Sequence, residues 1–217
     1  MRDTTRRALL QQGAFSLAAL LSVDATRRSA FGQSDRRAKF RMSLRCSSIG
    51  IQADQMKAIR LAHKHGFDAV VPDAGFLAEL SDDSRARLLE DMRDKQLVWG
   101  AAGLPVSFGG DDQRFEAGLK QLPRLADALQ KSGAKSMGTA IGSSSLQLTY
   151  LANFRRTATR IRACAKILAD HGLRLGLEYL GPKTMWASRR HSFVHSMAET
   201  KELIAEAGAD NNGQVAF

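Results

Sequence analysis

The sequence contains only two cysteines and no long apolar run. Cys46 and Cys164 do not form a C-x-x-C pair, which argues against a disulfide framework or a zinc-thiolate site. Both cysteines fall inside apolar strand or helix patterns, so we expect buried free thiols. No apolar segment reaches the ~20 residues that a membrane helix needs, and we therefore expect no stable membrane anchor.

Basic residues are unevenly distributed along the chain. The net charge of +10 would by itself suggest a nucleic-acid partner. However, residues 1–39 contain eight Lys/Arg and three Asp/Glu, so they carry +5 of this charge. The remaining 178 residues carry 24 Lys/Arg against 19 Asp/Glu, in a chain that is 44% hydrophobic and 25% charged. This composition is typical of a folded domain with one sizeable core and does not favour nucleic acid as a partner.

The first 39 residues have the pattern of an export signal followed by a linker. Arg6-Arg7 stand before a moderately apolar run from Ala8 to Val23, and Val23-Asp24-Ala25 offers small residues for cleavage. This arrangement resembles a twin-arginine signal and predicts a periplasmic or otherwise exported protein. The alternative is an ordinary amphipathic first helix. Residues 26–39 have turn composition and no hydrophobic period, so we expect a disordered linker there.

From Phe40 onward, short apolar segments alternate with helical patterns. We expect strands at 40–44, 68–71, 97–101, 135–141, 173–177 and 215–217, and helices at 53–65, 81–95, 114–131, 150–170 and 196–207. Ser81 and the acidic residues after it start one helix, and glycines end several others. The alternation predicts an α/β fold with a parallel sheet and right-handed crossovers.

The spacing of the strands limits how many units the domain, residues 40–217, contains. Successive strands are about 35 residues apart, so eight units would need roughly 280 residues, against about 178 here. One compatible architecture is an open doubly wound sheet. The other, which we favour, is a parallel (β/α) barrel of TIM type that is incomplete, with about five to six of eight units. An incomplete barrel has an unpaired edge, so we expect a marginally stable chain or a homo-oligomer.

One carboxylate stands at the end of an expected strand. Leu173 to Leu177 form a short apolar run that follows a helix, and Gly181-Pro182 stop it. Glu178 directly follows this run. Barrels of alternating strands and helices build their sites at the carboxyl ends of the strands, so Glu178 is the leading candidate for a functional side chain.

Three segments carry a likeness to known proteins: Lys-His-Gly-Phe-Asp-Ala-Val-Val at 64–71, Leu-Arg-Leu-Gly-Leu-Glu-Tyr-Leu-Gly-Pro at 173–182, and Ala-Glu-Thr-Lys-Glu-Leu-Ile-Ala-Glu-Ala-Gly-Ala-Asp-Asn at 198–211. The chain from Phe40 to Phe217 resembles the sugar phosphate isomerase/epimerase family of xylose-isomerase-like TIM barrels. The resemblance implies a carbohydrate substrate and a divalent metal, Mn, Mg, Co or Zn. It implies that Glu178 is both a metal ligand and a catalytic residue. The family's further ligands, an Asp, a His and a second Glu, would lie beyond Phe217.

The implied chemistry is physically reasonable. Isomerising or epimerising a sugar next to its carbonyl requires removal of a weakly acidic C–H proton. A carboxylate within reach of that carbon can take the proton, and a divalent cation can stabilise the enediolate that forms. One carboxylate alone does not hold a divalent cation, because such sites need several oxygen or nitrogen ligands.

Three further residues are candidates for substrate binding. Lys183 follows the Gly-Pro turn, Asp73 follows the second expected strand, and His191 stands before the last expected helix. The alternatives are a solvated lysine, a turn-forming aspartate and a loop histidine. His191 and His195 have the spacing of two ligands on one helix face, but they precede the helix, so we favour loop positions for both.

Three other features have a plainer interpretation. Gly142 to Ser145 offer N–H groups and hydroxyls as phosphate loops do, but without the lysine and spacing of a P-loop. We interpret Trp99 and Trp186 as core or pocket wall. The helix at 150–170 carries a group of basic residues, which we interpret as a solvated outer face: Arg155, Arg156, Arg160 and Arg162.

Three functions are compatible with these patterns. The first is a metal-dependent sugar isomerase or epimerase, with enediolate proton transfer at Glu178 and a site that is incomplete in this chain. The second keeps the barrel but cleaves phosphodiesters, as an endonuclease would, and would use the basic helix on phosphates. The third is a non-catalytic, truncated product that binds a carbohydrate weakly or does nothing.

Overall fold

The computed structural model describes residues 40–208 and 215–216. The contacts between residues divide the chain into Met1–Phe40 and Arg41–Phe217, and the second unit holds the domain. The expected export signal and linker at 1–39 therefore lie outside the described residues. Phe217, the last residue of the expected sixth strand, also lies outside them.

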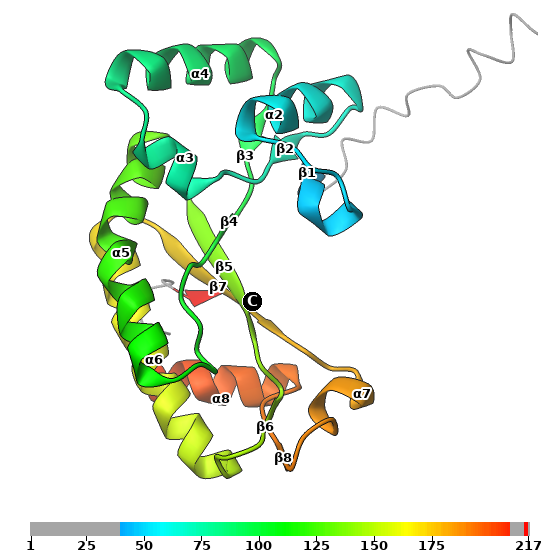
Figure 1. Ribbon diagram of the computed structural model, residues 1–217, viewed down its shortest axis with the longest axis vertical. Coiled ribbons are helices and arrows are strands. Elements are labelled where there is room, and N and C mark those ends of the chain that lie inside the picture. The colour runs from blue at the N-terminus through cyan, green and yellow to red at the C-terminus, as the bar shows by residue number, and fades with distance from the viewer. Residues whose placement is uncertain (1–39, 209–214, 217) are drawn as a thin grey trace, which may run out of the picture. The chain divides into compact units, whose positions relative to one another are not determined.

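The described elements alternate along the chain as expected (Figure 1). The helices are η1 (Cys46–Ile49), α2 (Gln55–Lys64), α3 (Ala74–Ala78), α4 (Asp82–Asp94), α5 (Asp112–Lys131), α6 (Tyr150–Asp170), α7 (Lys183–Trp186) and α8 (Met197–Ala207). The strands are β1 (Ser43–Leu44), β2 (Ala69–Val70), β3 (Val98–Trp99), β4 (Ala102–Gly103), β5 (Ser136–Ile141), β6 (Ser144–Ser145), β7 (Arg174–Tyr179), β8 (His191–Ser192) and β9 (Val215–Ala216).

The strand order identifies a singly wound sheet. β1, β2 and β3 pair in that order and in parallel, and β4, β5, β7 and β9 do the same. β3 and β4 are separated only by Gly100 and Ala101, so one stretch of chain joins the two sets. Within each of the two parallel sets, the strands therefore follow one another in chain order, whereas a doubly wound sheet reverses its order at a switch point. The incomplete TIM-type barrel is confirmed, and the expected third strand is two short strands instead of one.

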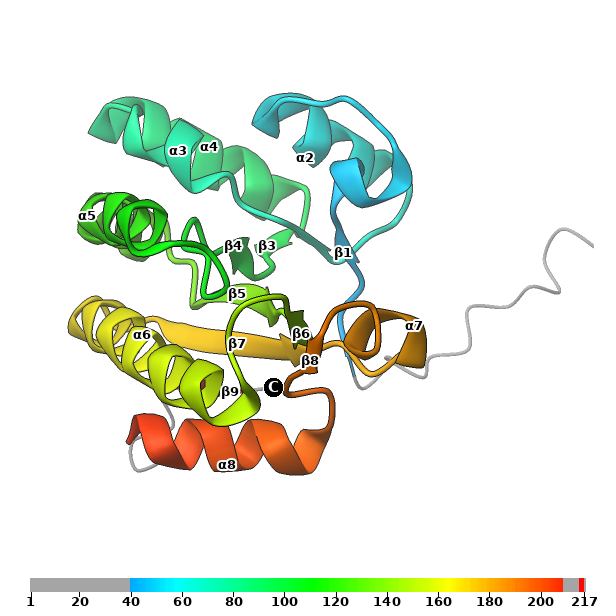
Figure 2. The ribbon, with the colours of Figure 1, turned by 60° about the horizontal axis from the view of Figure 1, so that its bottom comes forward.

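The long helices α5, α6 and α8 lie along one face of the strands, whereas α7 lies beyond the strand ends (Figure 2). On β7, Leu175 and Leu177 are buried in the hydrophobic core, while Arg174 and Glu178 are exposed. Side chains alternate between the two faces of a strand, so the buried set faces the helices and the exposed set faces the inner side of the sheet. The core also takes in both cysteines, which are free thiols as expected, and burial raises the pKa of Cys164 to about 12.

Several elements between the expected helices and strands were not predicted. η1, α3 and α7 are extra short helices, and α3 begins after Asp73. β6 pairs antiparallel with β8, so that Ser145 lies opposite His191. This pairing joins segments more than 40 residues apart, and no local pattern encodes it. None of the helices in the described part of the chain is long and apolar enough to cross a membrane.

The interpretation of the basic helix as a solvated face is wrong for Arg160. Its side chain is buried, and its guanidinium donates to the carbonyl oxygens of Phe108 at 2.8 Å and Gly110 at 2.7 Å. It also pairs with Asp112 at 2.5 Å and lies 4.6 Å from the centre of the Phe115 ring. Arg160 is buried because these groups satisfy its charge and its donors, which periodicity alone does not reveal.

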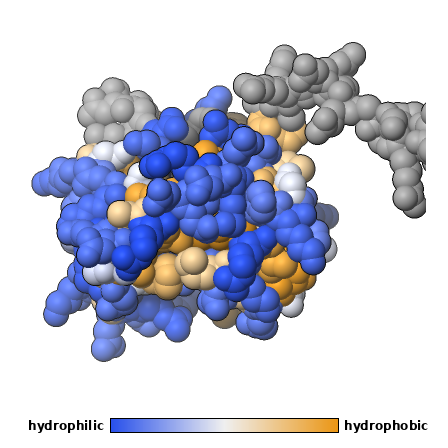
Figure 3. Space-filling view, turned by 90° about the horizontal axis from the view of Figure 1, so that it is seen from above, coloured by the Kyte–Doolittle hydropathy of each residue, from blue (hydrophilic) through white to orange (hydrophobic). Residues whose placement is uncertain are grey.

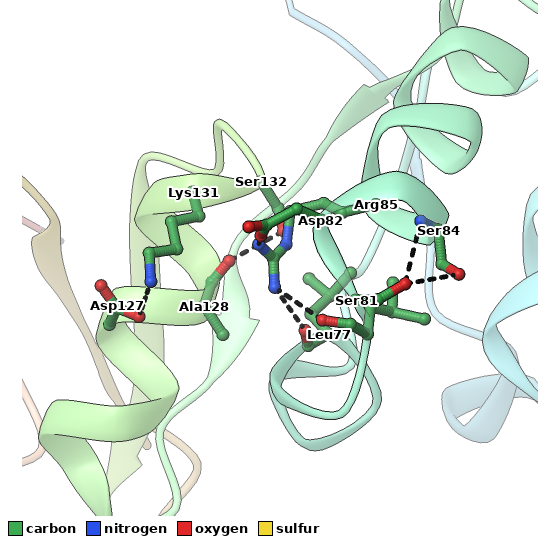
Figure 4. Close-up of polar contacts among 10 residues, drawn as sticks. Leu77, Ser81, Asp82, Ser84, Arg85, Asp127, Ala128, Lys131 and Ser132 are labelled. Carbon is green, nitrogen blue, oxygen red and sulfur yellow. Dashed lines mark hydrogen bonds and ion pairs between the residues drawn. The ribbon is translucent and has the colours of Figure 1, made fainter.

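A second buried arginine holds the junction between α3 and α4 (Figure 4). Ser81 caps α4 as expected, accepting a hydrogen bond from the Ser84 N–H. Arg85, one turn further on, donates to the carbonyl oxygens of Leu77 and Leu80 and pairs with Asp82. These bonds satisfy carbonyls at the end of α3, so they fix the turn between the two helices.

Hydrophilic side chains cover much of the face drawn in Figure 3, with hydrophobic surface exposed between them. Several large apolar side chains of the first described segment are exposed: Phe40, Met42, Ile49, Ile51 and Met56. Met42 lies just before β1, which is the first strand of its sheet. Scattered apolar residues are ordinary on protein surfaces, so this feature alone identifies no partner.

Helix ends follow the glycines that the sequence placed there, with one exception. Gly66, Gly133, Gly172 and Gly208 adopt φ values between 66° and 77°, the left-handed conformation that ends a helix. Among the described helices longer than one turn that lead into a strand, only α4 lacks such a glycine, and Gln96 adopts φ 55° in its place. A side chain in this conformation is strained, because its Cβ crowds the backbone.

We expect Gln96→Gly to raise the free energy of unfolding by about 1 kcal/mol, because glycine adopts the left-handed conformation without strain. Gln96 is exposed, so no packing is lost. Urea denaturation followed by circular dichroism would measure the change. Gln96→Ala is the matched control, since alanine keeps the Cβ and should not stabilise. Equal effects of the two substitutions would contradict the prediction.

Candidate active site on the inner face of the sheet

Glu178 lies at the carboxyl end of β7, one residue before the strand ends at Tyr179. It pairs in register with Ala140 of β5, and its side chain is on the exposed, inner face. The carboxylate has no hydrogen bond or ion pair with any of the described residues. The predicted position of Glu178 at a strand end is confirmed. Because the carboxylate has no partner among the described residues, it is available to a ligand.

The inner face forms a hollow of about 890 Å³ that includes Glu178. Many of its lining residues are small, and they come from β4, β5 and β7: Ala102, Gly103, Gly138, Ala140 and Gly176. A Cβ added at Gly103 would meet nothing within 4 Å. Glu178 is the one acidic residue among those lining the hollow, and Arg45 is the one basic residue. This face therefore has room for a small polar molecule next to one free carboxylate.

Asp73 is the N-cap of α3, as the turn-former interpretation expected. Its side chain accepts a hydrogen bond from the Phe76 N–H at 3.1 Å, and its own N–H donates to Gln55 Oε1 at 2.6 Å. It does not line the hollow of Glu178, but it lines two smaller neighbouring cavities of about 200 and 340 Å³. Arg45 lines all three cavities, so Asp73 lies beside the hollow and not in it.

Lys183 and His191 lie away from Glu178. Lys183 is the exposed first residue of α7, and His191 is half-buried in β8 opposite Ser145. Neither residue lines the hollow. His195 precedes α8, and its ring stacks on Trp186 with 4.7 Å between ring centres. The two histidines therefore do not share a helix face.

No group of three or more His, Cys, Asp and Glu side chains that could hold a metal occurs within the described residues. Glu178 is the only His, Cys, Asp or Glu among the residues that line the hollow. The described part of the chain therefore does not form a complete metal site.

A second pocket of about 560 Å³ lies past the carboxyl end of β5. Residues 107–110, residues 142–145 and the start of α6 line it, together with three arginines: Arg114, Arg156 and Arg189. The sequence analysis had singled out 142–145 and also Arg156, which it interpreted as part of a solvated basic face. The grouping of the three arginines was missed because they come from three segments, and only the fold brings them together.

A family comparison assigns the chain to a group of proteins. Residues 59–216 match the family described as xylose isomerase-like TIM barrel. The match covers most of the chain, and the protein belongs to this family. A search of curated proteins gave no match.

Solved structures support the fold. A xylose isomerase domain protein from Alicyclobacillus acidocaldarius is 28% identical, with a TM-score of 0.62 over 76% of this chain and 57% of that one. A D-psicose 3-epimerase is 20% identical, with a TM-score of 0.61 over 81% and 62%. The IOLI protein, solved with a zinc atom, is 15% identical, with a TM-score of 0.60 over 81% and 61%. The chain thus spans roughly three fifths of the length of these proteins.

The start of α8, near His195, carries a network around Glu199. Ser196 caps the helix and its hydroxyl donates to Glu199 at 2.7 Å, while the His195 N–H donates to the same carboxylate at 3.0 Å. Tyr150 adds a third bond at 3.2 Å. Burial by itself raises the pKa of Glu199, but the bonds from His195, Ser196 and Tyr150 outweigh it and lower that pKa. Burial and the Glu199 charge raise the pKa of Tyr150 to about 12.

We expect Glu199→Gln to lower the free energy of unfolding at pH 7 by about 1 kcal/mol, since a capping box loses its charged acceptor. A carboxylate whose pKa is lowered by folding stabilises the protein above its unfolded pKa, and this contribution is lost as the pH falls through the folded pKa. The difference from the wild type should therefore shrink below about pH 4.

Urea denaturation between pH 3 and pH 7 would measure this difference. Glu202→Gln removes the same charge from an exposed position of α8 and should have little effect. A difference that persists unchanged at pH 3 would show that the carboxylate charge is not responsible.

Proposed function

We propose that this protein acts as a sugar isomerase or epimerase, transferring a proton at a carbon next to a carbonyl, with Glu178 as the base. The observation that carries the proposal is the Glu178 carboxylate at the carboxyl end of β7, which has no partner among the described residues and faces a hollow with many small lining residues. Membership of the xylose isomerase-like family and the likeness of the fold to an epimerase support it.

The chemistry needs only a few features from the protein. The proton on a carbon beside a carbonyl is weakly acidic, and a carboxylate within hydrogen-bond reach can remove it and return it to the neighbouring carbon, which isomerises the sugar. Epimerisation also needs an acid that returns a proton to the same carbon from the opposite face of the enediolate. Glu178 has no competing partner among the described residues, so its oxygens are free to approach that carbon. The small side chains of β5 and β7 leave room for the sugar.

Metal dependence is part of the proposal in a limited form. Mn, Mg, Co or Zn would polarise the carbonyl oxygen, and Glu178 would supply one carboxylate ligand. The described residues do not complete the ligand set, so the remaining ligands would have to come from outside them. The zinc atom of the IOLI protein supports a metal only at the level of the shared fold.

We expect the protein to exchange the carbon-bound hydrogen next to the carbonyl of a ketose for deuterium in D2O. Exchange is more sensitive than net turnover, and proton NMR of D-fructose and other ketoses would follow it. Glu178→Gln should slow the exchange by at least about a hundredfold, because it removes the general base.

Glu202→Gln is the control for lost charge, because Glu202 is exposed on α8. Exchange at the uncatalysed rate with the unaltered chain would favour the non-catalytic alternative. Exchange that Glu178→Gln does not change would assign the base to another residue.

We also propose that residues 1–39 direct export by the twin-arginine route, on the pattern of Arg6-Arg7 before an apolar run. Fractionation of bacterial cells that express the full chain should find it in the periplasm. The double substitution Arg6→Lys and Arg7→Lys should retain it in the cytoplasm, whereas Arg27→Lys with Arg28→Lys should not. Cytoplasmic retention of the unaltered chain would refute the proposal.

A further inference from the structure

The second pocket concentrates positive charge. Arg114 comes from the first turn of α5, Arg156 from the second turn of α6, and Arg189 from the segment between α7 and β8. No aspartate or glutamate lines the pocket. Three positive charges around one cavity repel one another, and an anion bound between them would offset this repulsion.

The donors of these arginines are largely unused. The side chains of Arg114 and Arg189 make no hydrogen bond or ion pair within the described residues. Arg156 has only one long contact, 3.5 Å to Asn153 Oδ1, and its Nε is buried without a partner. A buried N–H without an acceptor is costly, so this geometry favours a ligand that brings acceptors. Burial, with the charge of Arg160 as the second cause, lowers the pKa of Arg156.

The walls of the pocket are held in place by the fold. Buried Arg160 binds the carbonyl oxygens of Phe108 and Gly110, which fixes the loop before α5. Ser145 accepts hydrogen bonds from two backbone N–H groups, which fixes the loop after β5. The pocket therefore exists before a ligand arrives, and binding does not have to order these two loops.

We propose that this pocket binds a phosphate monoester. A phosphate group carries nearly two negative charges and three acceptor oxygens, which matches three guanidinium groups better than the single charge of a carboxylate. Serine hydroxyls at 107 and 144 add polar lining. The first turns of α5 and α6 add the positive ends of two helix dipoles.

The position of the pocket connects it to the candidate active site. It is lined by Ile141, the last residue of β5, and by Leu180, two residues after Glu178. A sugar in the hollow of Glu178 could therefore place a phosphate group in this pocket. The inference that the substrate is a phosphorylated sugar rests on the proposed function, whereas the phosphate site itself does not.

Isothermal titration calorimetry of the full chain with inorganic phosphate tests the site. We expect saturable binding that Arg189→Gln weakens by at least about tenfold, because one charge-assisted hydrogen bond is lost. Arg190→Gln is the matched control, because Arg190 is also exposed but does not line the pocket. Arg156→Gln and Arg155→Gln form a second pair on α6, and only Arg156 lines the pocket.

Three results would overturn the phosphate site: no saturable binding of phosphate, equal weakening by the pocket and control substitutions, or tighter binding of acetate than of phosphate.

Titration with D-fructose 6-phosphate and D-fructose then tests the substrate class. We expect the phosphorylated sugar to bind at least about tenfold more tightly, and only while Arg189 is intact. Equal binding of the two sugars would overturn the substrate inference. If the unaltered chain binds phosphate but does not catalyse hydrogen exchange in a ketose, only the proposed function would be overturned.

Discussion

The parallel pairing of β5 with β7 is the constraint on which the rest of the domain depends. Six consecutive residue pairs, from Ser136 with Arg174 to Ile141 with Tyr179, fix the register of these strands. In this register Leu175 and Leu177 enter the core and Glu178 faces the hollow. A shift of one residue would turn the leucines to the open side and press Glu178 into the core against the helices. The register between β5 and β7 therefore determines both the packing of the core and the position of the candidate catalytic residue.

Two buried arginines show how charge stabilises this scaffold away from the strands. Arg85 binds carbonyls at the end of α3, and Arg160 binds carbonyls of the loop before α5. Each replaces hydrogen bonds to water with hydrogen bonds to backbone oxygens, and each has an aspartate beside it. Such groups are tolerated in a core because their donors are almost all satisfied. Arg160 also shapes the wall of the arginine-lined pocket.

The two cavities differ in the chemistry that they offer. The hollow of Glu178 has small walls and a free carboxylate, which suits proton transfer on an uncharged part of a substrate. The pocket past β5 is lined by three arginines with few partners among the described residues and by no carboxylate, which suits an anionic part. Both lie near the carboxyl ends of β5 and β7, the end at which barrels of this kind place their sites.

The sequence by itself determined the long helices, the main strands and the position of Glu178 at a strand end. Helical periodicity and terminal glycines predicted α6 at its observed bounds, and the apolar run before Glu178 predicted β7, because both signals are local. The tertiary structure alone decided between a singly and a doubly wound sheet, since strand order depends on contacts between distant segments. It separated Asp73, Lys183 and His191 from the hollow of Glu178. It also brought together Arg114, Arg156 and Arg189, which span 75 residues of chain, because packing and not spacing sets which loops meet at the end of a strand.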